Sequence, residues 1–251
     1  MSLLFVLGCT NSNHYEKGFQ VGPLVNEERD ESSNGINKDS LKFDTRPGSV
    51  LLTGIQNIRI TPIYKVNYNK REELFYTGSN GFHYRYDEEQ IDKDNNWHNH
   101  LMPGLEAVYG FNMVNISHYS LQELMQREFF EKPVLIRTVY FPCYERDTLN
   151  KLPVSRDYFL VSAYNEDTNK DGFINIKDLR RFFFFNIQGK MQKALVPENY
   201  AVMSSEYDPA NDLMLVSAQC DSNKNGQQEQ TEPIHIFWID LKNPASTGRL
   251  Y

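Results

Sequence analysis

The chain lacks the features that mark several large protein classes. Cysteine is scarce, because 251 residues contain only Cys9, Cys143 and Cys220, too few for a disulfide-stapled scaffold. No run reaches the ~20 consecutive apolar residues that a membrane-spanning helix needs. Basic residues are in deficit, with 26 Lys and Arg against 33 Asp and Glu, and the net charge is −7. A nucleic-acid partner would need a basic face, so the charge balance argues against one.

The sequence also has few signs of helices and none of the common catalytic motifs. The Ala-rich and Leu-rich periodic stretches of a helical bundle are missing, whereas 16 Phe and 15 Tyr are present. Aromatic and β-branched residues favour strands, so the composition predicts an all-β, mainly antiparallel protein. The HExxH, GxSxG, P-loop and dinucleotide-binding patterns are absent. The sequence therefore leans towards a protein without catalysis.

One segment of the sequence has residue types and spacing that predict a metal site. Residues 167–178 read DTNKDGFINIKD, and oxygen-bearing groups recur in it at the ligand positions of the twelve-residue EF-hand calcium loop. Gly172, at position 6, supplies the sharp turn. Ca²⁺ prefers roughly six to eight oxygen ligands, and a loop wrapped around the ion aims alternate residues inward. The predicted ligands are Asp167, Asn169, Asp171, the backbone carbonyl of Phe173, Asn175 and Asp178.

The loop is repeated about 54 residues later. LVSA precedes both copies, and the offset from Gly172 to Gly226 and from Phe183 to Phe237 is 54 residues. Two loops in the same register are much harder to obtain by chance than one, so we expect a second calcium site. Its predicted ligands are Asp221, Asn223, Asn225, the backbone carbonyl of Gln227, Glu229 and Glu232.

The sequences beside both loops favour strands. YFLVSAY and LMLVSAQ precede the loops, and RRFFFFNI and IHIFWIDL follow them. Pro233 also biases Glu232 towards an extended conformation. Each loop is therefore predicted to close a β-hairpin. Dockerin modules share the DxNxDGxIN motif, but in them a helix follows the motif, whereas a strand is expected here.

The repeat extends into larger units. Residues 49–251 are predicted to form one β-rich domain of about three units, residues 49–119, 133–190 and 199–251. Units of this length with a final F-x-x-(D/N)-(I/L) strand resemble β-propeller blades, which implies an open, partial or dimer-completed propeller. A β-sandwich with the same hairpins is the alternative. One short helix is expected over residues 120–132, because Ser120 and Glu123 form a capping box.

The N-terminus carries a different signal. MSLLFVLGCTNS resembles the end of a bacterial lipoprotein signal peptide, in which an apolar run and a small residue precede the lipidated cysteine. The resemblance implies that residues 1–9 are a signal remnant and that Cys9 carries a lipid anchor. Residues 10–48 are polar and are predicted to be a flexible linker. An ordinary buried apolar N-terminus remains the alternative.

The remaining candidates are weaker. Asp92, Asp94, Trp97, His98 and His100 cluster in one polar segment, where two histidines with nearby carboxylates could hold zinc, although a solvated surface loop is the simpler interpretation. His118 and His235 are expected to be packed or strand-surface residues. Cys143 and Cys220 are expected either to pair under oxidising conditions or to stay as thiols.

Together these patterns predict a calcium-binding lipoprotein of the bacterial cell envelope that acts as a binding or scaffold module. It resembles uncharacterised envelope lipoproteins that combine EF-hand-type loops with propeller-like repeats. The membrane would be contacted only through the lipid anchor, at the outer membrane, on its periplasmic or surface face. The candidate partners are an envelope protein, a glycan, or further copies of this chain in an oligomer. The alternative is a hydrolase of envelope polymers, or a metal-dependent enzyme, that uses residues 92–100.

Overall fold

The structure, a computed structural model, describes residues 18–21, 43–69, 74–76, 80–83 and 102–251. Within these ranges the chain forms strands and no helix, and every strand pairing is antiparallel. The all-β, antiparallel class predicted from the sequence is thus confirmed. No helix in the described part of the chain is long and apolar enough to cross a membrane.

Eleven strands form the largest sheet. Its main path contains β17 (Met191–Ala194), β16 (Arg181–Asn186), β14 (Tyr158–Tyr164), β11 (Leu135–Pro142), β9 (Met113–Ser120), β4 (Ile58–Lys65) and β2 (Thr45–Pro47). Four strands pair beside this path: β3 (Leu51–Leu52), β7 (Asn80–His83), β8 (Leu105–Gly110) and β10 (Met125–Glu128).

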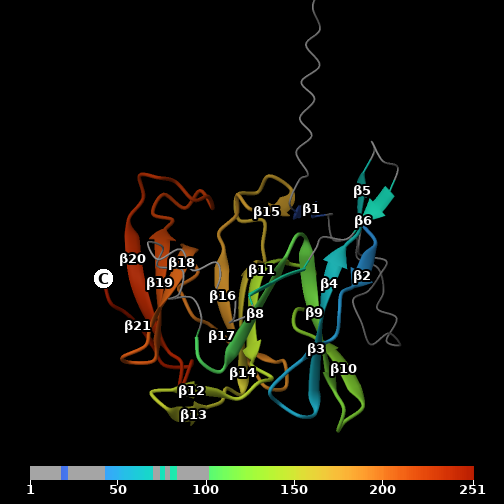
Figure 1. The fold of residues 1–251 in the computed structure, drawn as a ribbon. Helices are drawn as coiled ribbons and strands as arrows, with labels where there is room; N and C mark the ends of the chain where they lie inside the picture. Colours follow the sequence, from blue (N-terminus) through green and yellow to red (C-terminus); the bar gives the residue numbers. More distant parts are fainter. Residues whose placement is uncertain (1–17, 22–42, 70–73, 77–79, 84–101) are drawn as a thin grey trace, which may run out of the picture.

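A second sheet of four strands lies against one face of the first. Its order is β18 (Tyr200–Asp208), β19 (Leu213–Cys220), β20 (Ile234–Asp240) and β21 (Thr247–Arg249). Figure 1 shows this sheet in orange and red at one side of the molecule, with β2 and β4 at the other side. Three strand pairs complete the fold: β1 (Gly18–Gln20) with β15 (Phe173–Asn175), β5 (Asn67–Asn69) with β6 (Leu74–Tyr76), and β12 (Asp147–Leu149) with β13 (Leu152–Val154).

The run of four phenylalanines in β16 is explained by burial on both faces of the sheet. Phe183 and Phe185 belong to a core shared with β4, β9 and β11, whereas Phe182 packs into the core against the four-stranded sheet. Strands buried on both faces read as continuous apolar runs, because neither set of alternating side chains meets water. Each fully buried phenylalanine contributes roughly 1.5–3 kcal/mol relative to an exposed one.

The sequence repeat corresponds to a repeated meander. β11, β14, β16 and β17 are neighbours in this order, and so are β18, β19, β20 and β21. The register repeats as well, because Val161 pairs with Phe183 and Val216 pairs with Phe237. β11 also pairs with β8 and β9, so the first meander continues into the strands of residues 49–119 as one sheet. Membership of a propeller stays a prediction.

The helix expected over residues 120–132 is wrong. β9 ends at Ser120, and β10 returns beside it as the second strand of a hairpin. The Ser120 hydroxyl accepts a hydrogen bond from the Glu123 N–H at 3.1 Å, which is the contact a capping box predicts, yet here it closes the hairpin loop. Leu121 and Leu124 are exposed, and Leu124 has a φ of 52°. A helix would need those side chains on a buried stripe, which this surface does not offer.

The range 10–48, predicted as a linker, contains two short strands. β2 pairs with β4, and β1 pairs with β15, far along the chain. Phe19 of β1 is buried with Val114, Leu135 and Ile174. For residues 18–20 and 45–47 the linker interpretation is therefore corrected, because these residues join the fold.

Candidate metal centre

The two predicted calcium loops lie at the same end of the molecule (Figure 1). Loop 1, residues 167–178, follows β14, contains β15 and leads to β16, whereas loop 2, residues 221–232, connects β19 to β20. Each loop connects the second and third strands of its meander. The strand, loop, strand arrangement expected from the sequence is thus present in both.

Loop 1 is organised by its own side chains. The Asp167 carboxylate accepts hydrogen bonds from the N–H groups of Asp171, at 3.1 Å, and Gly172, at 2.8 Å. Asn169 Oδ1 also accepts from the Asp171 N–H, at 3.0 Å. The Asp171 carboxylate in turn accepts from the Phe173 N–H at 2.9 Å. The side chains at positions 1, 3 and 5 therefore turn towards the inside of the loop.

Loop 2 repeats this scheme. The Asp221 carboxylate accepts from the N–H groups of Asn225, at 3.1 Å, and Gly226, at 3.0 Å. Asn223 Oδ1 accepts from the Asn225 N–H at 2.9 Å, and Asn225 Oδ1 accepts from the Gln227 N–H at 2.9 Å. Every bond joins the same two loop positions as its counterpart in loop 1. The sequence motif that the two loops share thus specifies one backbone conformation.

The backbone angles repeat too. Positions 4 and 6 have positive φ in both loops, at 60° for Lys170, 86° for Gly172, 60° for Lys224 and 72° for Gly226. Glycine adopts such angles without a steric cost, which explains its presence at position 6 of each loop.

The acidic residue at position 12 folds back over each loop. Asp178 accepts from the Thr168 N–H at 2.8 Å, and Glu232 accepts from the Ser222 N–H at 2.8 Å. Both carboxylates are buried. Burial raises the pKa of Asp178 from its ordinary value, although hydrogen bonds from the Asn175, Asn169 and Thr168 N–H groups oppose the shift. Each carboxylate is therefore withdrawn from water at the loop interior.

The two position-12 residues differ in one respect. Both oxygens of Asp178 accept hydrogen bonds, the second from the Asn175 N–H at 2.8 Å. Glu232 Oε2 is buried and has no hydrogen-bond partner in the part of the chain that the structure describes. An unpartnered buried carboxylate oxygen is costly, and a bound cation would satisfy it.

The side chains at positions 3, 5 and 9 meet one another. In loop 1, the Asp171 carboxylate accepts from the amides of Asn169, at 3.2 Å, and Asn175, at 3.4 Å. In loop 2 the acceptor stands at position 9 instead, because the amides of Asn223 and Asn225 donate to the Glu229 carboxylate at 2.9 and 2.8 Å. Rotation of an Asn amide exchanges its NH₂ for its oxygen, so each group could present oxygens to a cation.

The available ligands are all hard oxygens. No three His, Cys, Asp or Glu side chains converge as a ligand group within the described ranges, so both loops rely in addition on Asn and on backbone carbonyls. Across the same ranges, no Lys or Arg forms an ion pair with a loop carboxylate. Carboxylate, amide and carbonyl oxygens suit Ca²⁺ and match the predicted ligand set.

The two loops touch each other. The Thr168 hydroxyl donates to the Gly226 carbonyl at 2.6 Å. β1 also pairs with β15, inside loop 1, where Phe19 lies opposite Ile174. Sequence analysis did not reveal either contact, because a three-residue strand carries no periodic signal of its own.

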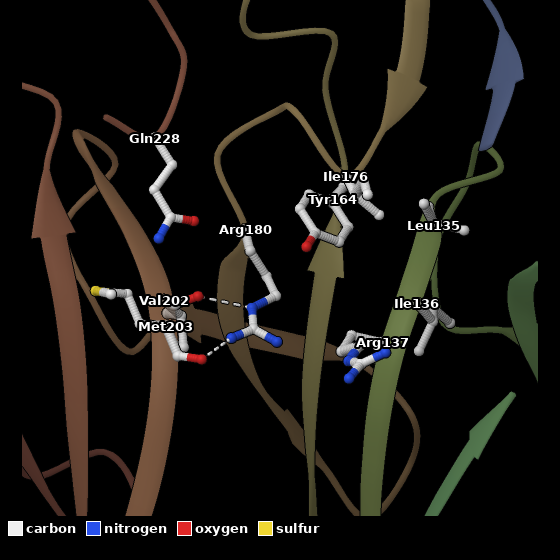
Figure 2. Close-up of a pocket in the computed structure, with 9 residues that line it drawn as sticks. All are labelled: Leu135, Ile136, Arg137, Tyr164, Ile176, Arg180, Val202, Met203 and Gln228. Carbon is white, nitrogen blue, oxygen red and sulfur yellow. Dashed lines mark hydrogen bonds between the residues drawn. The ribbon is translucent and has the colours of Figure 1, made fainter. Parts of the chain in front are cut away.

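A cavity of about 400 Å³ lies beside the loops. Figure 2 shows its lining side chains, which come from strands of both sheets and from both loops. They are Leu135, Ile136, Arg137, Tyr164, Ile176, Arg180, Val202, Met203 and Gln228. Sequence reasoning missed this site, because no motif links residues so far apart in the chain.

The other predicted residues have simpler environments or lie outside the described part of the chain. Cys9 and the cluster within residues 92–100 fall outside it. Cys143 and Cys220 are both half-buried, and no disulfide joins them to each other. His118 is buried, and His235 Nδ1 lies 2.7 Å from the Tyr200 hydroxyl. Comparison with protein-family models, curated proteins and solved structures found no match to this chain.

Proposed function

We propose that this protein is a non-catalytic binding module of the bacterial envelope, in which loop 1 and loop 2 each bind one Ca²⁺. The observation that carries the proposal is the repetition of one hydrogen-bond scheme in both loops, with an acidic side chain at position 12 folded back over each. The unpartnered Glu232 Oε2 adds a buried oxygen for a cation to neutralise.

The role of calcium in this proposal is structural. The ligands of each site come from one continuous loop, so no open coordination position for a substrate is expected. The ion would supply positive charge among carboxylates that form no salt bridge with a Lys or Arg of the described residues. At a free calcium concentration of 100 times Kd, one bound ion adds about 2.7 kcal/mol to the free energy of unfolding.

Thermal unfolding tests the calcium sites. The melting temperature is measured in EDTA, in Ca²⁺ and in Mg²⁺ for the wild type and for Asp167→Ala and Asp221→Ala. We expect Ca²⁺ to raise the melting temperature of the wild type and each variant to lose part of the increase. Glu145→Ala, which removes an exposed carboxylate outside the loops, is the matched control and should keep the full increase. An equal melting temperature in EDTA and Ca²⁺ for the wild type would refute the proposal.

The envelope location has its own test. The sequence MSLLFVLGC supports lipidation of Cys9, so expression of the full-length precursor in a Gram-negative host should yield acylated, membrane-associated protein. Mass spectrometry should find the lipid on Cys9, and Cys9→Ser should release the protein in soluble form. Recovery of the wild type without a lipid would remove the lipoprotein part of the proposal and leave the calcium sites unaffected.

A further inference from the structure

The cavity beside the loops carries positive charge from two arginines. Arg137 lies on β11, and Arg180 directly precedes β16. Figure 2 shows both guanidinium groups in the space between the two sheets. No Asp or Glu of the described residues forms an ion pair with either group. Like charges that share a cavity repel each other unless an anion joins them.

Arg180 is held in place by the second sheet. Its Nε donates to the Val202 carbonyl at 2.7 Å, and a second guanidinium nitrogen donates to the Met203 carbonyl (Figure 2). Two of its nitrogens are thus committed to backbone oxygens. The remaining nitrogen makes no hydrogen bond within the described part of the chain and is available to a ligand.

A β-bulge places Arg137 in the cavity. Ile136 pairs with Ala163 and Thr138 pairs with Ser162, so Arg137 is the extra residue of β11. Bulges re-aim a side chain and are frequent beside functional sites. The Arg137 side chain is exposed and makes no hydrogen bond or ion pair with the described residues.

The second meander has the same bulge. Val202 pairs with Ala218 and Ser204 pairs with Ser217, so Met203 is the extra residue of β18. Both bulges lie opposite the consecutive Ser and Ala residues of the repeated LVSA motif. Both bulged residues line the same cavity. The repeat therefore brings a cationic side chain and an apolar side chain to opposite walls.

We propose that this cavity binds an organic carboxylate with an aliphatic body, with Arg137 and Arg180 on the carboxylate and Ile176 and Met203 on the aliphatic part. Planar guanidinium groups match the geometry of a carboxylate. Tyr164 and Gln228 add polar groups to the lining, and a volume of about 400 Å³ admits a ligand of this size. Exposed apolar side chains in the lining favour this ligand over inorganic phosphate.

This inference deepens the proposed binding function and rests on it, because Ile176 and Gln228 belong to the two calcium loops. Calcium binding and carboxylate binding are therefore measured separately on the same full-length protein. A protein that binds calcium but no carboxylate would overturn only this inference. Loss of calcium binding alone would overturn only the proposed function.

The test uses ligands that differ in one group. Binding of N-acetyl-leucine, N-acetyl-leucinamide, glucuronate and inorganic phosphate is followed by NMR titration with saturating Ca²⁺. We expect N-acetyl-leucine to bind in the millimolar range or tighter, and at least tenfold more tightly than each of the others. Equal binding of the neutral amide would overturn the role of the guanidiniums. Equal or tighter binding of glucuronate or phosphate would overturn the role of the aliphatic body.

Variants at an exposed position keep the test independent of folding. Arg137→Gln should weaken binding of N-acetyl-leucine at least tenfold, and Arg137→Lys should restore part of it, because the charge returns without the planar fork. Arg146→Gln, an exposed arginine outside the cavity, is the matched control and should bind as the wild type does. Unchanged affinity in Arg137→Gln, with an unchanged melting temperature, would overturn the inference.

Discussion

The Thr168 hydroxyl donates a hydrogen bond to the Gly226 carbonyl at 2.6 Å, so position 2 of loop 1 touches position 6 of loop 2. The same hydroxyl accepts from the Leu179 N–H at 2.8 Å and lies 3.2 Å from the Asp178 carboxylate. One side chain thus joins the closing residues of loop 1 to the sharp turn of loop 2. A substitution that alters the conformation of one loop is therefore expected to alter the other loop as well.

Gly226 should tolerate alanine far less well than Gly172. A Cβ at Gly226 would lie 2.0 Å from the Thr168 carbonyl oxygen, whereas a Cβ at Gly172 meets no atom within 4 Å. Both have positive φ, so both variants lose about 1–2 kcal/mol from backbone strain. Gly226→Ala should lose about 1–3 kcal/mol more through overpacking. Urea unfolding of the two variants measures the difference, and equal losses would show that the loops do not touch.

Thr168 should contribute more to the stability of the protein than its counterpart in loop 2 does. Thr168→Val keeps the shape but removes the bond to loop 2, so we expect a loss of about 1–3 kcal/mol in the free energy of unfolding. Ser222 occupies the same position in loop 2, and among the described residues its hydroxyl hydrogen-bonds only to Glu232. Ser222→Ala should therefore cost less than 1 kcal/mol, about one ordinary hydrogen bond. A larger loss in Ser222→Ala would contradict the proposed pairing of the loops.

The effect of Glu232→Gln on the free energy of unfolding should have opposite signs with and without calcium. In EDTA the variant removes a buried carboxylate whose Oε2 has no partner, so we expect it to be more stable than the wild type by about 1 kcal/mol. In Ca²⁺ it should be less stable, because a ligand of loop 2 is weakened. Denaturant unfolding under both conditions gives the two differences.

Glu206→Gln, an exposed position on β18, serves as the control and should show the same small effect in both conditions. A Glu232→Gln variant that is destabilised equally with and without Ca²⁺ would mean that this carboxylate has a purely structural role.

His118 should make stability depend on pH. Burial lowers the pKa of His118 below its ordinary value. Its Nε2 lies 2.9 Å from the Ile187 carbonyl, and its buried Nδ1 has no hydrogen-bond partner among the described residues. The unfolded chain therefore takes up a proton at a higher pH than the folded chain does. The contribution of His118 to the free energy of unfolding is fully present above about pH 6.5, the ordinary pKa of histidine. It is lost as the pH falls from there through the lowered pKa of the folded state.

We expect His118→Gln, which keeps an N–H donor, to flatten the decrease in stability below that pH. Urea unfolding between pH 5 and pH 8 provides the comparison. A variant whose stability follows the wild-type pH profile would show that another group titrates in this range.

Much of the fold was predictable because local patterns and the repeat agree. The register of Val161 with Phe183 recurs as Val216 with Phe237, as the repeated LVSA motif and the repeated apolar strand after each loop imply. The capping box failed for a physical reason: the contact between Ser120 and Glu123 closes a helical turn and a hairpin loop equally well. Burial of the surrounding apolar residues decides between the two, and it is a property of the fold rather than of the segment.

The cavity could not be predicted, because its arginines become neighbours only through strand pairing. Arg137 faces the cavity as the extra residue of a bulge, and a one-residue slip in pairing leaves no mark in the pattern of β11. Arg180 lies two residues after the end of loop 1 and is therefore close to a recognised motif, but its anchoring carbonyls belong to β18 of the other sheet. Contacts of this kind depend on tertiary structure.

The stoichiometry of calcium binding tests the central claim most directly. In calorimetric titration of the full-length protein, we expect two Ca²⁺ per chain, with dissociation constants of about 10⁻⁴ to 10⁻³ M as in extracellular modules. Asp167→Ala and Asp221→Ala should each bind one ion, and the double variant should bind none. A wild type that binds no Ca²⁺ in this range, or single variants that still bind two ions, would contradict the assignment of one ion to each loop.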